Sequence, residues 1–251
     1  MDPVAELLEE WQLTPDGEPA GVVPVRTAAG RPAVLKLGAA DQEHLALQHW
    51  HGGAAVQLLR ADPHRAAVLL ERAHPEDLAD HWDVAACEIV GGLYARLHVP
   101  APPQLPRLSQ ELLRWTAGLA DAPLPRRLVE QVRALAQAFA TDGGTDGRLL
   151  HTDLHYGHVL AADRQPWLAI APEPLSGDPH FEVAPLLWHR WDELEGDVRR
   201  GVRARFHAAI DAALLDEDRA RDWVVVRAVL RAAADPGEAS RCIAVAKAVQ
   251  D

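Results

Sequence analysis

The stretch LLHTDLHYGHVLAADRQPWLAIAPEP (Leu149–Pro174) decides how this chain is interpreted. Its alternation of apolar and polar residues and its turn residues predict two short strands that bracket a loop. The loop contains His151, Asp153 and His155, and side chains two residues apart share one face of an extended segment. In that conformation the two imidazoles and the carboxylate converge as metal ligands.

Two interpretations of the His-x-Asp-x-His pattern stay open from the residues alone. One is a metal-dependent hydrolase that uses these side chains as ligands. The other is a loop whose histidines form hydrogen bonds with the backbone, and the spacing matches none of the common zinc motifs.

The residues on either side of this stretch predict an α+β architecture with two lobes. A β-rich lobe is expected over residues 1–73, with a hairpin in Val22–Leu37, a helix over Asp41–Trp50 capped by Asp41, and two further strands. A larger helical lobe is expected over residues 74–251, with a hinge near Glu71–Pro75. The expected helices of this lobe are Asp83–His98, Ser109–Leu119, Leu124–Ala140, Val198–Leu215, Glu217–Ala234 and Ala239–Val249.

Composition excludes several classes of partner. The 251 residues include 25 Lys and Arg against 37 Asp and Glu, a formal charge of −12, and no basic run. Binding to nucleic acid or to anionic lipid rests mainly on such basic charge, so neither partner is expected. The acidic N-terminus does not resemble a signal peptide, no long apolar span follows, and two cysteines form no disulfide framework. These features predict a soluble, cytoplasmic protein with buried thiols.

The order of several motifs resembles the protein-kinase-like fold. Lys36 lies in a predicted strand, Glu43 early in the next helix, and Glu71 at the end of a strand before the hinge. In detail the chain is similar to the aminoglycoside and hydroxyurea antibiotic phosphotransferases, of the streptomycin 6-kinase type, whose pattern is close to LLHGDLHxxNVL…PWLAIDPEPLxGDP. It keeps the Leu-Leu-His, Asp-Leu-His, Val-Leu, Pro-Trp-Leu-Ala-Ile and Gly-Asp-Pro elements.

The resemblance implies an ATP-dependent phosphotransferase with an alcohol acceptor, which would use Mg²⁺. Lys36 would contact the nucleotide phosphates and be held by Glu43, and the segment from Glu71 to Ala73 would contact the adenine. Asp153 would be the catalytic base, with His151 and His155 beside it.

Departures from the family pattern fall on the residues that would bind the metal. The Asn five residues after the catalytic Asp is His158 here, and the Asp of the Ile-Asp-Pro motif is Ala171. Mg²⁺ prefers oxygen ligands, and an alanine methyl group cannot bind a cation. The segment Leu13–Gly21 also leaves little chain for a phosphate-covering turn. These changes predict a pseudokinase-like protein that keeps a small-molecule cleft.

Two other functions stay open. One is an active phosphotransferase acting on a natural product or antibiotic. The other is a cleft recruited for different acid/base chemistry by its histidines and Asp153, in which His158 holds a softer metal such as Zn²⁺.

The predicted acceptor side has also changed. Family members tend to show Gln-Asn-x-x-Trp-Asp near the C-terminus, whereas this chain has Leu230–Asp235, in which only Asp235 survives. Asp235 and Asp192, in the segment HRWDEL, are the candidate substrate-binding residues. We expect an acceptor pocket that has lost its aromatic wall and gained an arginine. A small-molecule ligand is predicted, with a cationic natural product as one option because the surface is acidic, and a protein partner if the chain is a pseudokinase.

Overall fold

The computed structural model describes residues 3–39, 41–194 and 196–250, which form two compact units. The first unit runs to Asp77 and also includes His158–Glu173. The second comprises Leu78–Gly157 and the chain from Pro174 onward. The sequence analysis expected two lobes that were each continuous in sequence, whereas the chain here returns to the first unit after the 151–157 loop.

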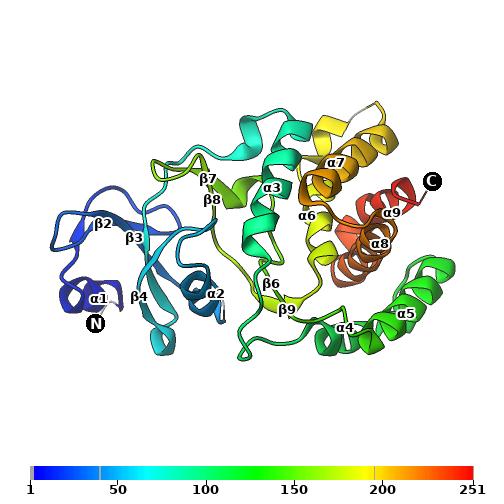
Figure 1. Cartoon of the computed structure of the whole chain (residues 1–251), viewed down its shortest axis with the longest axis horizontal. Coiled ribbons are helices and arrows are strands. Elements are labelled where there is room, and N and C mark those ends of the chain that lie inside the picture. The colour runs from blue at the N-terminus through cyan, green and yellow to red at the C-terminus, as the bar shows by residue number, and fades with distance from the viewer. Residues whose placement is uncertain (1–2, 40, 195, 251) are drawn as a thin grey trace. The chain divides into compact units, whose positions relative to one another are not determined.

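The N-terminal unit is built on an antiparallel sheet with the strand order β1-β2-β3-β5-β4, of which β2, β3 and β4 are labelled in Figure 1. The predicted hairpin of Val22–Leu37 is confirmed: β2 and β3 pair antiparallel, with Val23 opposite Leu35 and Arg26 opposite Pro32. The elements of this sheet and its helices are α1 (Pro3–Glu10), β1 (Thr14–Pro15), β2 (Val23–Arg26), β3 (Pro32–Leu37), α2 (Glu43–Trp50), β4 (Leu58–Asp62) and β5 (Ala67–Glu71).

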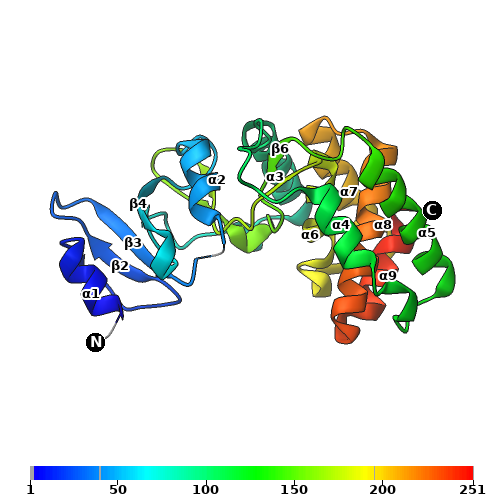
Figure 2. The ribbon, with the colours of Figure 1, turned by 90° about the horizontal axis from the view of Figure 1, so that it is seen from below.

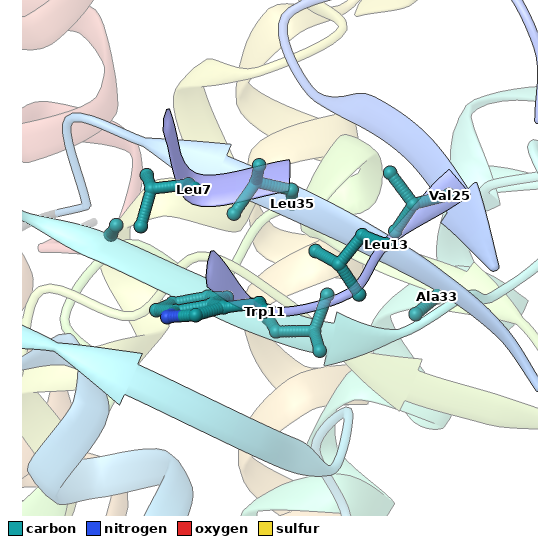
Figure 3. Close-up of a cluster of buried hydrophobic side chains, with 8 residues drawn as sticks. Leu7, Trp11, Leu13, Val25, Ala33 and Leu35 are labelled. Atoms are coloured by element: carbon teal, nitrogen blue, oxygen red, sulfur yellow. The ribbon is translucent and has the colours of Figure 1, made fainter. Parts of the chain in front are cut away.

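Helix α1 packs against one face of this sheet (Figure 3). On β3, Ala33 and Leu35 are two residues apart and both are buried, as expected for side chains on the same face of a strand. Leu7 of α1 and Trp11, just after it, bury their side chains in the same cluster. This apolar contact anchors the N-terminal helix to the strand that carries Lys36.

Helix α2 begins two residues later than predicted, and the predicted capping role of Asp41 is wrong. The N-cap is Gln42, which has a φ of 66° and forms no side-chain cap hydrogen bond. The residue before α2 therefore has a left-handed backbone conformation, which the sequence Asp41-Gln42-Glu43 does not indicate. Glu43 becomes the first residue of the helix.

Residues 158–173 form a hairpin that belongs to the N-terminal unit. Strands β7 (Val159–Ala161) and β8 (Trp167–Ala169) pair with each other, Val159 opposite Ala169. The Val56 N–H donates to the carbonyl of Ala169 over 3.0 Å, which attaches the hairpin to the segment before β4.

The C-terminal unit is mainly helical. Helices α7 and α8 both pack on α9, α3 packs on α7, and α4 packs on α5 (Figure 2). Helix α8 begins and ends at the predicted residues; an Asp216 side chain accepts from the Arg219 N–H at its start, and Pro236 follows its end. The elements are α3 (Asp83–Leu97), α4 (Leu108–Thr116), α5 (Arg126–Thr141), β6 (Arg148–Leu150), β9 (Leu175–Gly177), α6 (Ala184–Trp188), α7 (Val198–Ala213), α8 (Glu217–Ala234) and α9 (Ala239–Ala248).

The close approach of α3 and α7 depends on Gly91. A Cβ atom at Gly91 would lie 2.7 Å from the carbonyl oxygen of Ala209 and 2.7 Å from the Cβ of Ala212. We expect Gly91→Ala to lower the free energy of unfolding by about 1–3 kcal/mol, because the two helices must move apart. Denaturant unfolding followed by circular dichroism measures the change.

The adjacent glycine provides a matched control. A Cβ at Gly92 has no neighbour within 4 Å among the described residues, so Gly92→Ala should raise stability by about 0.5–1 kcal/mol through helix propensity. Equal stabilities for the two variants would contradict the packing argument.

The burial of the cysteines agrees with the sequence analysis. Cys87 and Cys242 are both free and buried, as predicted. Burial raises the pKa of the Cys87 thiol to about 12, so it stays protonated at neutral pH. Within the described ranges, every helix is too short or too polar to cross a membrane.

Candidate functional site

The N-terminal unit brings together Lys36 and Glu43. Lys36 lies on β3 opposite Val68, and its Nζ is 2.8 Å from Oε2 of Glu43, the first residue of α2. The Glu43 side chain is fully buried, while that of Lys36 is 21% exposed. A buried carboxylate is tolerated only when it is paired, so this contact fixes the lysine to the helix. The ion pair implied by the resemblance is present.

Glu71, the predicted nucleotide-contact residue at the end of β5, is held inside the same unit. Its Oε1 accepts the Gln57 N–H over 2.9 Å and an Arg164 guanidinium N–H over 2.5 Å. Its own backbone N–H donates to the carbonyl of Gln57. The side chain therefore joins β5 to the β7–β8 connection, a structural role that the sequence did not indicate.

The two positions of the family metal ligands are neighbours on the β7–β8 hairpin. The carbonyl of His158 accepts the Ile170 N–H over 3.0 Å, and Ala171 follows directly. Ala171 has a φ of 54°, in the left-handed region where Asp and Asn are the most frequent residues after glycine. The backbone at this position is thus suited to the family's Asp, but the carboxylate is absent. An imidazole and a methyl group do not fit Mg²⁺.

In the C-terminal unit, the loop after β6 is not extended, which corrects the assumption that placed His151, Asp153 and His155 on one face. Thr152 has a φ of 67°, and this left-handed residue interrupts the alternation. It occupies the glycine position of the family pattern. His151 is fully buried, whereas the side chain of Asp153 is 34% exposed.

Glu182 holds this loop in place. Its fully buried carboxylate accepts the backbone N–H groups of His151 and Thr152, and Nε2 of His98 lies 3.8 Å from its Oε1. Burial by itself would raise the pKa of Glu182, but the contacts with His98 and with His151 lower it below its usual value. Glu182 was not predicted, because its partners lie 30 or more residues earlier in the chain.

The carboxylate of Asp153 lies beside His155. Oδ2 of Asp153 is 3.9 Å from Nε2 of His155, whose ring stacks on that of His189 with centroids 3.9 Å apart. The Gly157 N–H donates to Nδ1 of His155, so the neutral ring carries its proton on Nε2, toward Asp153. Of the three predicted catalytic residues, Asp153 and His155 are brought together at a partly exposed position.

The two predicted substrate-binding residues are Asp235 and Asp192. The Asp235 side chain accepts the Gly237 N–H over 2.9 Å and caps a turn after α8, and Asp192 is exposed on a 3₁₀ turn over Trp191–Leu194. The largest pocket described for this unit has a volume of about 650 Å³, and neither aspartate is among the residues of its wall.

The expectation of a lost aromatic wall was wrong. The pocket is lined by Trp115 of α4, Trp188 of α6 and Phe181, which lies between β9 and α6. The family motif covers only Leu230–Asp235, whereas these aromatic residues are contributed by segments far away in the chain. The sequence around Leu230–Asp235 therefore does not indicate them.

Comparison with solved structures defines the class of protein first. The fold is similar to that of the choline kinase LicA from Streptococcus pneumoniae, with a TM-score of 0.64 and 11% identity over 98% of this chain and 96% of that one. A sheet-based first unit and a helical second unit thus form a two-lobed kinase-like α+β fold.

Sequence relationships then define the family. Residues 7–237 match the aminoglycoside/hydroxyurea antibiotic resistance kinases. The chain is 41% identical to a streptomycin 6-kinase of Streptomyces glaucescens, over 96% of this chain and 84% of that one. It is 40% identical to a hydroxyurea phosphotransferase of Kitasatospora aureofaciens, over 90% of this chain and 70% of that one. The chain belongs to this kinase family, as the sequence analysis predicted.

Proposed function

We propose that this chain is a pseudokinase-like member of its family, which binds a small molecule and has lost ordinary Mg²⁺-dependent phosphoryl transfer. The observation that carries the proposal is Ala171, which stands at the family's metal position with a left-handed backbone and without a carboxylate. Phosphoryl transfer needs the charge on the nucleotide phosphates to be neutralised, and His158 and Ala171 do not supply oxygen ligands for that metal.

An active ATP-dependent phosphotransferase is the second candidate, and it is favoured by the Lys36–Glu43 ion pair. In this reading Lys36 contacts the nucleotide phosphates. Asp153 orients the acceptor hydroxyl and accepts its proton, on a loop that Glu182 holds through two backbone N–H groups. The ligand would be a natural product or antibiotic, since the relatives named above act on streptomycin and hydroxyurea.

Calorimetric titration with ATP, in the presence and absence of Mg²⁺, separates the two candidates. We expect the same weak ATP affinity in both conditions, because the family metal positions hold no oxygen ligand. The Lys36→Ala variant is the control, since it should remove whatever ATP binding is present. Tight binding of ATP that depends on Mg²⁺ would overturn the pseudokinase proposal in favour of the active enzyme.

A further inference from the structure

The pocket of about 650 Å³ in the C-terminal unit has a wall of unusual composition for a site that would take a polycation. Its size lies within the range of roughly 300–1,000 Å³ that is typical of sites for small organic ligands. Three aromatic side chains, two arginines and one aspartate line it: Trp115, Phe181, Trp188, Arg227, Arg231 and Asp121.

The aromatic side of the pocket offers flat apolar surface. The rings of Trp115 and Phe181 are nearly parallel, at 17°, with centroids 6.2 Å apart. Trp115 is 39% exposed, while Phe181 and Trp188 are almost fully buried. A planar ligand that covers Trp115 would remove this apolar surface from water.

The arginines lie one turn apart on α8, and both guanidinium groups lie over the ring of Trp188, at 5.5 Å for Arg227 and 5.1 Å for Arg231. Arg227 donates to two neutral backbone oxygens, those of Phe181 and Thr152, over 3.0 and 2.8 Å. In the described part of the chain, no carboxylate forms an ion pair with Arg227.

The carboxylates of Glu182 and Asp153 stabilise the charge of Arg227 from a distance, without an ion pair. Desolvation lowers the pKa of this guanidinium to about 10. Arg231 forms a long ion pair with Glu238, which is not part of the wall, with 3.7 Å between Nη2 and Oε2, and Asp121 of the wall is exposed to water. The wall thus carries a net positive charge beside apolar rings, which favours an anion and disfavours a cation.

Two unsatisfied hydrogen-bond donors in the wall also favour a ligand that carries acceptor oxygens. The Nε1–H of Trp188 and the Nε–H of Arg231 are buried and have no acceptor among the residues that the structure describes. Both atoms are covered by neighbouring atoms. A ligand that brings carboxylate oxygens would satisfy groups that are otherwise costly to bury.

We propose that this pocket binds a planar, unsaturated small molecule that carries a carboxylate group. The inference rests on the proposed small-molecule-binding function and replaces the earlier option of a cationic ligand. The planar body covers the exposed face of Trp115, and the carboxylate accepts from Arg231. Arg227 sets the positive potential and, through the carbonyl of Thr152, also holds the loop of Asp153.

The test is calorimetric titration of the full chain with three probes that share one ring system: naphthoate, naphthylmethanol and naphthylmethylammonium. Streptomycin serves as the polycationic probe. We expect naphthoate to bind best, the alcohol more weakly, and both cations not at all. Tighter binding of either cation than of naphthoate, or no binding of naphthoate, would overturn the proposal.

Charge variants at the pocket locate the binding. Arg231→Gln should weaken naphthoate about tenfold and leave naphthylmethanol unchanged, because a charge-assisted hydrogen bond is lost. Trp115→Ala should weaken the binding of both probes equally.

A second pair of variants changes the charge at Ala234, which is exposed in the pocket wall. Ala234→Glu should weaken the binding of naphthoate, whereas the isosteric Ala234→Gln should not. An unchanged naphthoate affinity in both Arg231→Gln and Ala234→Glu would contradict the assignment of this pocket.

The ATP titration and the naphthoate titration test the proposed function and the pocket independently. Naphthoate binding together with Mg²⁺-dependent ATP binding would reject the pseudokinase and retain the anion pocket. Absent naphthoate binding with Mg²⁺-independent ATP binding would reject the pocket and retain the pseudokinase.

Discussion

Replacing Glu182 with alanine is expected to lower the free energy of unfolding by about 3–5 kcal/mol, one of the largest single-residue effects in the chain. The carboxylate is fully buried, and its removal leaves the backbone N–H groups of His151 and Thr152 without their acceptor. It also leaves His98 without the carboxylate that lies 3.8 Å from its ring. Urea unfolding of the variant and the parent chain measures the loss.

The pH dependence of stability gives a second measurement of the same contact. The pKa of Glu182 is lowered in the folded chain, so the stability it contributes is fully present above its unfolded pKa of about 4.3 and is lost as pH falls through the lower, folded value. Glu182→Gln keeps the side-chain shape but does not ionise, so it should be less stable than the parent chain near neutral pH. The difference between the two should shrink at acidic pH.

A matched control is Glu88→Gln, an exposed carboxylate on α3. Its stability should follow that of the parent chain at every pH, because exposed carboxylates contribute little. If Glu182→Gln showed the same constant difference from the parent at acidic and neutral pH, the ionised form of Glu182 would not be what holds the loop.

The elements that the sequence predicted well are those whose signals are local. The β2–β3 hairpin has its turn residues between two β-branched runs, and α8 has a capping aspartate before it and a proline after it. The contact between Lys36 and Glu43 was implied by the family resemblance, and the two residues are only seven positions apart in the sequence.

The features that the sequence did not predict depend on contacts between distant segments. Two strands were expected in the stretch 149–174, yet β6 pairs with β9 and β7 pairs with β8, and each strand has only three residues. Strands this short carry too few residues for a clear alternation pattern. The carboxylate of Glu182 and the aromatic wall likewise become visible only when the fold brings separate elements together.

The double variant Ala171→Asp with His158→Asn is expected to raise the rate of Mg²⁺-dependent ATP hydrolysis by about 10²-fold or more, since each lost electrostatic anchor costs roughly that factor. The two positions are neighbours on one hairpin, and the left-handed φ of Ala171 accommodates Asp at least as well as Ala. The change should therefore be tolerated, and a coupled phosphate-release assay with purified protein measures it.

The matched control is Ala171→Asn, again with His158→Asn. Asparagine has the same backbone preference and nearly the same shape as aspartate but no charge. Any gain in ATP hydrolysis that comes only from relieving the strained backbone at position 171 therefore appears in both variants. A gain confined to the aspartate variant assigns the defect to the missing metal carboxylate. If both variants hydrolyse ATP at the parent rate, the limiting defect lies elsewhere, and the short β1, with only Thr14 and Pro15 before the turn to β2, is the next position to restore.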